Sequence, residues 1–436
     1  MTTETSKTEV GSYFISNYPP FSLWKPELLD EVKTVMSAPP VPDTPLGLYL
    51  HIPFCRKRCK FCYFKVFTEK NAKEIETYVS ALSREIELVS ALPFMGGRPF
   101  RFVYFGGGTP SFLSSKQLTS LVDRLRANIN WDDAEEVTFE CEPGTLQENK
   151  IKTLKELGVT RLSLGVENFT DSVLEENGRA HLSKQVFQAW DWIKAADFPN
   201  VNIDLISGMV GETWDNWKDN IRQAIEMSPE SVTIYQMELP FNTVYSADIL
   251  GNKIETPVAD WQTKRDWLNY AFDEFLSAGY HISSAYTVVK DPTKVNFSYR
   301  DNLWQGSDLL ATGIASFGHI NGVHYQNKPK WEDYTGDLLE AGELPLGRAY
   351  RPTKQQALIR EFILNLKKGY LDSGYFQEKF GVDIIDEFSS ALKEHQSNEM
   401  LKLDGNRIEL TRQGLLNADG LLPAFFEPEH RGIRYT

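Results

Sequence analysis

The sequence predicts an α/β fold, in which a sheet of mainly parallel strands is covered by helices. Short apolar runs with β-strand character alternate with amphipathic stretches over residues 46–237, and this alternation is typical of parallel strands joined by right-handed crossovers. Past Pro345 the pattern changes to helices followed by a small hairpin. Because 436 residues also exceed a single ordinary core, we expect one large domain and a smaller one.

Composition and charge narrow the class of protein. The residues are 41% hydrophobic and 12% aromatic, enough to build a buried core. The net charge of −14 argues against a nucleic-acid partner, which would need clustered Lys and Arg. We see no apolar run near the roughly 20 residues of a membrane span and no signal peptide at the start. Four cysteines in so long a chain indicate a reducing compartment, so we expect a cytoplasmic protein.

Residues 1–45 are expected to form an irregular N-terminal arm. Prolines within residues 18–21 and 39–42 disfavour regular structure there, although a short helix is plausible from Pro26 to Met36. From Leu46 the chain alternates between strands and helices. The predicted strands are Leu48–Ile52, Phe102–Phe105, Glu136–Glu140, Arg161–Val166, Val201–Ile206 and Ser231–Met237. The predicted helices include Lys73–Leu92, Ser115–Ile129, Asn149–Leu157 and Trp214–Met227.

Six such units fit either a doubly wound sheet or a partial barrel. Both folds place ligand-binding groups at the carboxyl ends of the strands. The alternation loosens between Tyr280 and Tyr325 into a Gly- and aromatic-rich segment, and we expect residues 280–345 to cover the substrate.

Residues 346–436 are expected to form a winged-helix-like α+β cap. Its predicted elements are helices over Thr353–Lys368 and Asp383–His395, a hairpin over Leu401–Leu410 that turns at Asp404-Gly405, and a helix over Thr411–Phe425 begun by a Thr cap. Because this region has no basic stripe, a structural lid is favoured over DNA binding.

Three of the four cysteines lie in the loop after the first predicted strand, as Cys55-x3-Cys59-x2-Cys62. Three crowded thiols leave one without a disulfide partner, whereas thiolates this close together suit zinc or an iron–sulfur cluster. Structural zinc normally takes four ligands, and His51 or the distant Cys141 could complete that shell. Three thiolates on a [4Fe–4S] cube instead leave the fourth iron open to a small molecule. The spacing alone keeps both alternatives open, and Cys141 is expected to face the core.

Other residues suited to ligand binding follow the next strands. Three glycines at 106–108 end the second strand, where backbone groups could approach a ligand, although a tight turn would explain them equally well. Acidic side chains lie in or after the third to fifth strands at Glu140, Glu167 and Asp204. Buried acids need partners. Ribose hydroxyls or an amino group would serve, and a salt bridge inside the barrel with Arg179 is the alternative.

Together these motifs resemble a known family. The run from Tyr49 to Cys62, followed by Gly-Gly-Gly-Thr-Pro at 106–110, is similar to the radical S-adenosylmethionine (SAM) enzymes. More narrowly, it resembles the family of oxygen-independent coproporphyrinogen III oxidase and heme chaperones. The likeness extends to Phe426 through Gly165-Val166, Gly178-Arg179, Asp204-Leu205-Ile206 and Leu309–Gly318. It implies a partial (β/α)6 radical SAM barrel over residues 46–345 with a cap over 346–436, and it makes zinc the weaker alternative.

The resemblance also implies the cofactors and their binding residues. A [4Fe–4S] cluster would be held by Cys55, Cys59 and Cys62, with SAM chelating its fourth iron. Tyr49 and Glu140 would be the catalytic residues and would contact the same SAM. Further contacts with this cofactor are implied for Gly107, Gly108, Thr109 and Phe317.

A second SAM molecule lies beside the first in the oxidase. The matching positions here are Phe61, Glu167, Arg179, Asp204 and Met237. Two positions depart from the oxidase, which has a fourth cysteine where this chain has Phe64 and a Gln where it has Glu167. By contrast, residues 17–20 are similar to a Tyr-Pro segment near the start of the oxidase, which the heme chaperones lack.

The implied activity is that of a radical SAM oxidoreductase in heme biosynthesis. An electron donor such as flavodoxin or ferredoxin would reduce the cluster, and cleavage of SAM would give a 5′-deoxyadenosyl radical. This radical would abstract hydrogen from a tetrapyrrole, such as a porphyrinogen propionate, or from a similar small molecule. The alternatives are a class C radical SAM methyltransferase that uses two SAM molecules, and a heme-trafficking chaperone without turnover.

Overall fold

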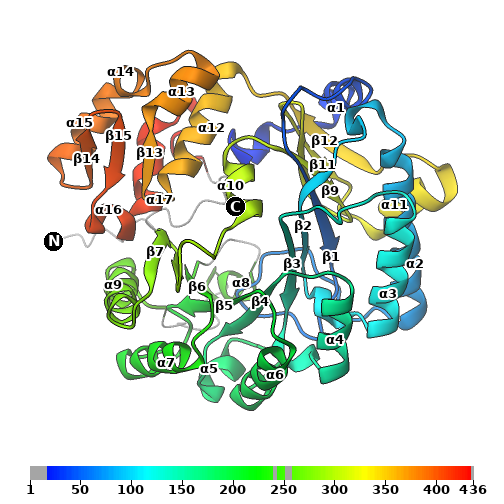
Figure 1. The fold of residues 1–436 in the computed structure, drawn as a ribbon, viewed down its shortest axis with the longest axis horizontal. Helices are drawn as coiled ribbons and strands as arrows, with labels where there is room; N and C mark the ends of the chain where they lie inside the picture. The colour runs from blue at the N-terminus through cyan, green and yellow to red at the C-terminus, as the bar shows by residue number, and fades with distance from the viewer. Residues whose placement is uncertain (1–16, 239–242, 251–257, 434–436) are drawn as a thin grey trace.

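A single large sheet dominates the structure, a computed structural model that describes residues 17–238, 243–250 and 258–433. Its 12 strands have the order β12-β11-β10-β9-β1-β2-β3-β4-β5-β6-β8-β7. Strands β1 to β6 and β9 are parallel, and in Figure 1 they form an arc with helices on its outer side. The expected α/β fold is confirmed, in the form of a partial (β/α)6 barrel.

The six predicted strands are present, close to their expected ends. The parallel strands are β1 (Leu46–Ile52), β2 (Phe100–Gly107), β3 (Glu136–Cys141), β4 (Arg161–Glu167), β5 (Asn200–Ser207), β6 (Ser231–Gln236) and β9 (Asp308–Thr312). Apolar side chains alternate along them and fill the space under the helices, as at Leu48, Leu50 and Ile52 of β1, which are fully buried.

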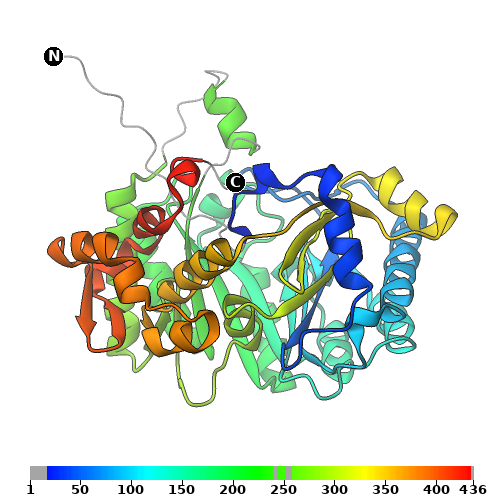
Figure 2. The same cartoon turned by 90° about the horizontal axis from the view of Figure 1, so that it is seen from above.

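Helices connect these strands and cover the outer face of the arc. They are α2 (Ala72–Ser90), α3 (Ser115–Arg126), α4 (Glu148–Glu156), α5 (Asp171–Glu176), α6 (Ser183–Ala196), α7 (Trp214–Met227) and α9 (Trp261–Ser277). Capping boxes at Asn71 and Ser114 begin α2 and α3. A short helix, α8 (Val244–Leu250), projects from the barrel in Figure 2. Of the helices in the described ranges, none is long and apolar enough to cross a membrane.

The segment over residues 280–345 contains strands that the sequence pattern did not predict. They are β7 (His281–Ser284), β8 (Thr287–Val289), β9, β10 (Phe317–Ile320) and β11 (Val323–Asn327), with helices α10 (Ser298–Trp304) and α11 (Trp331–Gly336). Strand β9 pairs in parallel with β1, and the antiparallel hairpin β10–β11 extends that edge. These strands have only three to five residues each, too few for a clear alternation.

The C-terminal region has its own small sheet and its own apolar cluster. Strands β13 (Tyr370–Asp372), β15 (Arg407–Leu410) and β14 (Leu401–Asp404) are antiparallel. They pack with α12 (Lys354–Leu366), α13 (Ser373–Phe380), α14 (Ile384–Glu387), α15 (Ser389–Ser397), α16 (Arg412–Leu416) and α17 (Ala418–Leu421). In Figure 1 this region lies beside β7.

Two details of the C-terminal region differ from expectation. Strand β12 (Leu346–Tyr350) pairs with β11 in the large sheet, so a boundary at 345/346 assigns one barrel strand to the cap. The predicted helices over 383–395 and 411–425 are each interrupted, at Phe388 and at Asn417. Phe388 leaves the helical path because its ring packs against Phe362 and Phe425, with centroids 4.5 and 5.6 Å apart. The predicted hairpin is present, but its turn is formed by Gly405 and Asn406, one residue later than expected, because Asp404 still pairs with Arg407.

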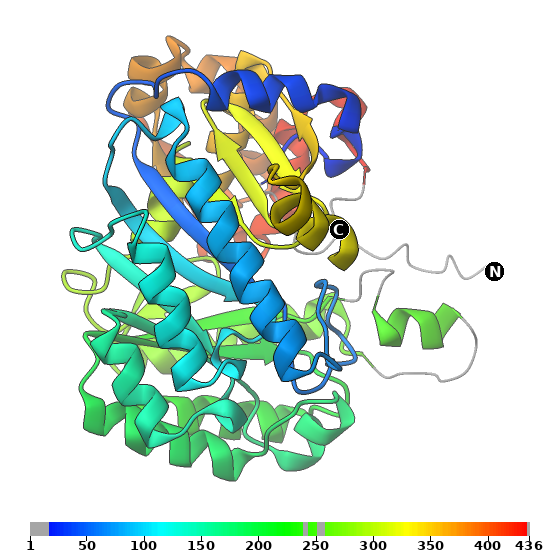
Figure 3. The same ribbon diagram turned by 90° about the vertical axis from the view of Figure 1, so that its right-hand side faces the viewer.

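The N-terminal arm, whose residues 1–16 lie outside the described part, packs on the β12 edge. Helix α1 (Leu29–Met36) crosses the strands of this edge in Figure 3. Lys25 and Ala349 exchange two backbone hydrogen bonds of 3.1 Å. Trp24 is buried and stacks on His324 of β11 at 4.9 Å. Tyr18 is fully buried against Phe426 of the C-terminal region.

A buried glutamate of α2 ties the outer helices to the loop after β9. Glu85 accepts hydrogen bonds from the Tyr334 hydroxyl (2.6 Å), the Asn327 amide (2.6 Å) and the Gly313 N–H (2.9 Å). Burial nevertheless raises its pKa to about 7. Since the folded chain holds this proton more tightly than the unfolded chain, the stability it contributes is complete below about pH 4.5 and is lost as pH rises through about 7.

Glu85→Gln is expected to lower the free energy of unfolding by about 1–3 kcal/mol, because the new amide N–H faces donors and leaves one of them unsatisfied. It should also flatten the fall in stability between about pH 5 and 8. Urea unfolding at several pH values measures both effects. The control is Glu87→Gln, an exposed position of the same helix, and an unchanged pH slope in Glu85→Gln would contradict the assignment.

Candidate functional site

The cysteine loop, which carries Cys55, Cys59 and Cys62, follows the carboxyl end of β1. Backbone hydrogen bonds hold it both at its base (the neck) and at its tip. At the neck, Cys55 N–H donates to Phe67 O (3.0 Å) and Phe67 N–H donates to Pro53 O (2.7 Å). At the tip, Lys60 N–H donates to Asn177 O (3.1 Å), just after α5. Cys55, Cys59 and Cys62 are half-buried and form no disulfide. The loop therefore presents three free thiols from a fixed backbone.

Two side chains donate hydrogen bonds to these thiols. Thr109 Oγ1 lies 3.4 Å from Cys55 Sγ, and Arg179 Nη1 lies 3.4 Å from Cys59 Sγ. Burial raises the pKa of Cys55 to about 12 and also raises that of Cys62. The thiols of Cys55 and Cys62 are therefore expected to ionise when a cation binds beside them, which suits a metal-binding loop.

The glycine loop, which is the Gly-Gly-Gly-Thr-Pro segment at 106–110, lies directly against the cysteine loop. Gly108 N–H donates to Ile52 O (2.9 Å), and Thr109 N–H donates to Phe54 O (2.8 Å). A Cβ on Gly108 would lie 2.9 Å from Phe54 O. Gly107 has a φ of +115°, and a Cβ there would lie 2.5 Å from the His51 ring. Gly108 is required because its backbone lies against the backbone of the cysteine loop, and Gly107 is required by its positive φ and by the His51 ring beside it.

Glu140 of β3 links the glycine loop to two stacked tyrosines. Its carboxylate accepts from the Tyr104 hydroxyl (2.7 Å) and from Gly107 N–H (3.1 Å). Tyr49 stacks on Tyr104 with centroids 5.9 Å apart, and the Tyr49 hydroxyl lies 3.2 Å from His51 Nδ1. Burial raises the pKa of Glu140. The Nε2 atom of His51 is buried and has no hydrogen-bond partner among the residues that the structure describes, so it can still bond to a ligand.

Two more acids belong to β4 and β5, where Glu167 is the last residue of β4 and Asp204 lies within β5. Glu167 follows an irregularity in the pairing of β4 with β5 and has a φ of +63°. Its carboxylate lies 3.6 Å from Arg179, which also donates to Gly165 O at 2.9 Å. Asp204 accepts from Ser163 and from Asn202, each at 2.8 Å.

Burial, together with the charges of Glu167 and Glu140, raises the pKa of Asp204 to about 8. Burial also raises the pKa of Glu167, although the Arg179 guanidinium opposes the shift. The three acids of these neighbouring strands thus affect one another, and they favour a cationic ligand.

The remaining predicted positions divide into two groups. Phe61 and Met237 pack into one apolar cluster with Val173, Ile206 and Met209, beside the cysteine loop. Phe317 of β10 instead packs against Phe21 and Trp24 of the N-terminal arm, with centroids 5.3 and 5.6 Å away. The fourth cysteine, Cys141, is 4% exposed within the core, apart from the other three.

The sequence analysis did not predict the buried pair of Glu142 and His181, which lies close to Arg179. His181 Nδ1 lies 2.9 Å from Glu142 Oε1, which also accepts from Gly144 N–H at 2.9 Å. Burial acts to raise the pKa of Glu142, but the contacts with His181 and Arg179 lower it overall. The position of Glu142 two residues after Glu140 at a strand end was the available signal, whereas His181 lies in a loop without a motif.

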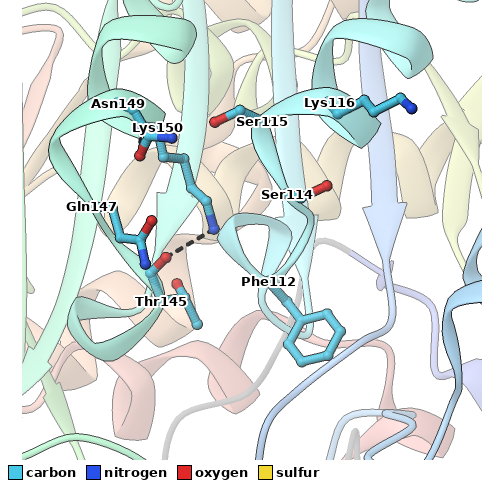
Figure 4. A pocket seen from close by; sticks show the side chains of 8 residues that line it. All are labelled: Phe112, Ser114, Ser115, Lys116, Thr145, Gln147, Asn149 and Lys150. Atoms are coloured by element: carbon cyan, nitrogen blue, oxygen red, sulfur yellow. Dashed lines mark hydrogen bonds between the residues drawn. The ribbon is translucent and has the colours of Figure 1, made fainter.

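A cavity of about 480 Å³ opens outside this cluster, between the segments after β2 and β3. It is lined by Phe112, Ser114, Ser115, Lys116, Thr145, Gln147, Asn149 and Lys150. Figure 4 shows Lys150 directed at the backbone of Thr145, and its ammonium donates to Thr145 O (2.8 Å) and Ser111 O (2.5 Å). The Lys150 ammonium thus links the two segments through their backbone carbonyls. It is therefore already paired and does not serve as a binding group for a ligand in the cavity.

Comparison with known proteins decides the chemistry of the three thiols. Residues 49–224 match the family model of the radical SAM superfamily. The chain contains a radical SAM domain. The match favours an iron–sulfur cluster over zinc, and the cofactors of the domain are a [4Fe–4S] cluster and SAM. Cys55, Cys59 and Cys62 have the Cys-x3-Cys-x2-Cys spacing for this cluster, and the donors to Cys55 and Cys59 fit its thiolates.

The relatives that match most of this chain have two different names. The heme chaperone HemW of Bacillus subtilis is 27% identical over 380 residues, which cover 86% of this chain and 98% of that protein. The oxygen-independent coproporphyrinogen III oxidase of Synechocystis is 25% identical over 422 residues, which cover 92% of this chain and 89% of that protein. The alignment with each relative is much longer than the 49–224 segment that matches the radical SAM model.

One solved structure shares the fold over nearly the whole chain. Coproporphyrinogen III oxidase (HemN) from Escherichia coli superimposes with a TM-score of 0.81 at 24% identity, covering 94% of this chain and 96% of that one. The radical SAM barrel and the region that follows it therefore share one overall fold with that enzyme.

Proposed function

We propose that this protein is a radical SAM enzyme that removes hydrogen from a propionate-bearing tetrapyrrole. The observation that carries the proposal is the assembly of the cysteine loop and the glycine loop, which follow β1 and β2, with three acids of β3, β4 and β5. A tetrapyrrole is supported by the names of the relatives, which are a coproporphyrinogen oxidase and heme chaperones. Turnover is favoured by residues 17–20, which resemble a Tyr-Pro segment near the start of the oxidase that the heme chaperones lack.

The bound cluster and SAM supply one-electron cleavage of a carbon–sulfur bond, which generates a radical able to abstract hydrogen. In the proposed site, Cys55, Cys59 and Cys62 hold the cluster. Thr109 and Arg179 stabilise two of the thiolates through hydrogen bonds of 3.4 Å. Both donors are held in place without a ligand. The backbone of Thr109 is bonded to Phe54 O, and the guanidinium of Arg179 is bonded to Gly165 O.

Glu140 and the tyrosines are proposed to position SAM and exclude water. The glycine loop brings Gly107 N–H and the Glu140 carboxylate to the same place. The stacked rings of Tyr49 and Tyr104 form an apolar wall next to that carboxylate. Such a wall keeps water from a reactive radical. Phe317 contacts Phe21 of the N-terminal arm, so its contact with SAM stays a prediction from the resemblance.

A second SAM site is proposed around Phe61, Glu167, Arg179, Asp204 and Met237. The apolar cluster with Phe61 and Met237 could pack against an adenine ring, and Asp204 offers a carboxyl group to a ribose or an ammonium. The ion pair between Glu167 and Arg179, at 3.6 Å, is the competing arrangement that would close the site.

Equilibrium dialysis of the reconstituted protein with labelled SAM is expected to give a stoichiometry near two, as the proposed second site requires. Glu167→Gln tests whether the ion pair opposes binding, because the amide cannot form it. The matched control is Glu175→Gln, at an exposed position of α5. A stoichiometry near one in both the wild type and Glu167→Gln would overturn the two-SAM proposal, and a rise from one to two would show that Glu167 closes the site.

Anaerobic incubation with SAM, reductant and coproporphyrinogen III tests the proposed reaction. Formation of 5′-deoxyadenosine with loss of carbon dioxide from the tetrapyrrole is the expected result. Methylated product with S-adenosylhomocysteine would instead identify the methyltransferase alternative.

A heme chaperone is the second candidate, and one position favours it. Phe64 occupies the place of the oxidase's fourth cysteine and is 41% exposed, so no thiol is available there. Tight heme binding and its transfer to an apoprotein, without SAM-dependent change of any tetrapyrrole, would establish this function.

A further inference from the structure

The cysteine loop has a charge opposite to that of the protein. The chain carries 60 acidic and 46 basic residues, which gives a net charge of −14. Residues 55–68 nevertheless contain no Asp or Glu and five cations, which are Arg56, Lys57, Arg58, Lys60 and Lys65. A positive patch on an acidic protein attracts acidic partners and repels further copies of the same chain.

Most of these cations are exposed around the thiols. Arg56, Lys57, Arg58 and Lys65 are exposed, whereas Lys60 is half-buried and forms an ion pair with Glu176 at 3.1 Å. Every one of them lies within three positions of a cysteine in the sequence. The patch therefore surrounds the same short segment that supplies the thiolates.

Backbone contacts hold part of this surface in place. Arg56 Nη1 donates to Gly144 O (2.7 Å), and Arg58 Nη2 donates to Cys62 O (3.1 Å). Between the cations, Phe64 is 41% exposed and packs on Tyr63 with centroids 4.6 Å apart. An exposed aromatic ring within a rim of charge is typical of a protein-binding surface.

We propose that residues 56–65 form the docking surface for an acidic one-electron donor protein of the flavodoxin type. The inference rests on the proposed function, because a radical SAM enzyme needs its cluster reduced before each cleavage of SAM. Reduced flavin on the donor loses one electron, and the cluster gains it, passing from the 2+ to the 1+ state. The docked donor would lie against the very loop that holds the cluster, which keeps the path for the electron short.

The charge reversal Lys57→Glu with Lys65→Glu tests this surface without touching a thiol or its donors. The matched control is Lys294→Glu with Lys393→Glu, which makes the same charge change at two exposed positions, one in the loop after β8 and one in α15. Lys57→Arg with Lys65→Arg preserves the charge. Iron and sulfide analysis first establishes equal cluster content, and each single charge reversal is measured as well.

Stopped-flow absorbance follows reduction of the cluster by flavodoxin hydroquinone. At low ionic strength the charge reversal is expected to slow the second-order step roughly tenfold, by loss of electrostatic steering. The deficit should shrink at about 0.5 M salt, where the Debye length falls to a few ångströms. Reduction by photoreduced 5-deazaflavin, a small neutral donor, should not change. The arginine variant and the control should behave as the wild type.

An equal loss in the control variant, or a loss that salt does not alter, would overturn the proposal. Weaker binding of coproporphyrinogen III with unchanged reduction by flavodoxin would also overturn it, and would assign the cations to substrate carboxylates. Because the rate of cluster reduction is measured without substrate, this outcome is separate from whether the protein is an oxidase or a chaperone. Failure of the wild type to assemble a cluster would instead contradict the proposed function.

Discussion

Replacing any one of Cys55, Cys59 and Cys62 with Ala is expected to abolish cluster assembly and SAM cleavage. Each thiol belongs to a loop whose backbone is fixed at its neck and tip, so no other cysteine can move in to replace a lost ligand. Anaerobic reconstitution followed by iron analysis, visible absorbance and assay of 5′-deoxyadenosine measures the effect. The loss of SAM cleavage should be complete within the sensitivity of the assay.

Cys141→Ala is the matched control for these variants. Cys141 is 4% exposed in the core, and its thiol lies 3.8 Å from Phe139 O. The variant should keep its iron and its SAM cleavage and lose only stability, by roughly 1 kcal/mol, as expected for a small cavity. Loss of the cluster in Cys141→Ala, or its retention in Cys59→Ala, would contradict the assignment.

Gly108→Val is expected to reduce SAM cleavage by about a hundredfold or more, as displacement of a reacting group by about 1 Å commonly does. A Cβ at this position lies 2.9 Å from Phe54 O and 3.0 Å from Ile52 O, both backbone atoms. Since these atoms also accept the hydrogen bonds that join the two loops, the cysteine loop itself must shift. We therefore expect the iron content to fall together with SAM cleavage.

Gly336→Val is the control, since a Cβ there meets no atom within 4 Å. It should retain both iron and cleavage. Full iron with lost cleavage in Gly108→Val would show that the glycine loop acts on SAM alone. Unchanged cleavage would show that the loop is only a turn.

The barrel could be predicted from the sequence because its strands are buried and regularly spaced. Each run from Leu48 to Met237 is followed by an amphipathic helix, and the carboxyl ends of parallel strands meet at one edge. That rule alone brings the cysteine loop, the glycine loop and Glu140 together. The hydrogen bond from Gly107 N–H to Glu140 and the close approach of Gly108 to Phe54 confirm that these segments meet.

Other features depend on contacts that a single sequence does not reveal. The strands β10 and β11 are short and contain polar residues such as His324, whose burial results from strand pairing and from the stacking of Trp24. The partnership of Glu142 with His181 joins residues 39 positions apart across two loops. The break at Phe388 follows from aromatic packing within the C-terminal region, which overrides helical propensity.

The N-terminal arm contacts both the barrel and the C-terminal region. Tyr18 contacts the C-terminal region through Phe426, and its hydroxyl accepts from Glu427 N–H at 3.1 Å. Seven residues later, Lys25 is bound to the edge strand β12. The same short segment is thus shared by both regions, and a fragment that begins at β1 would leave apolar surface of each exposed. We therefore expect that the chain, although modular in its sequence pattern, does not divide into independently stable parts at the domain boundary that this pattern suggests.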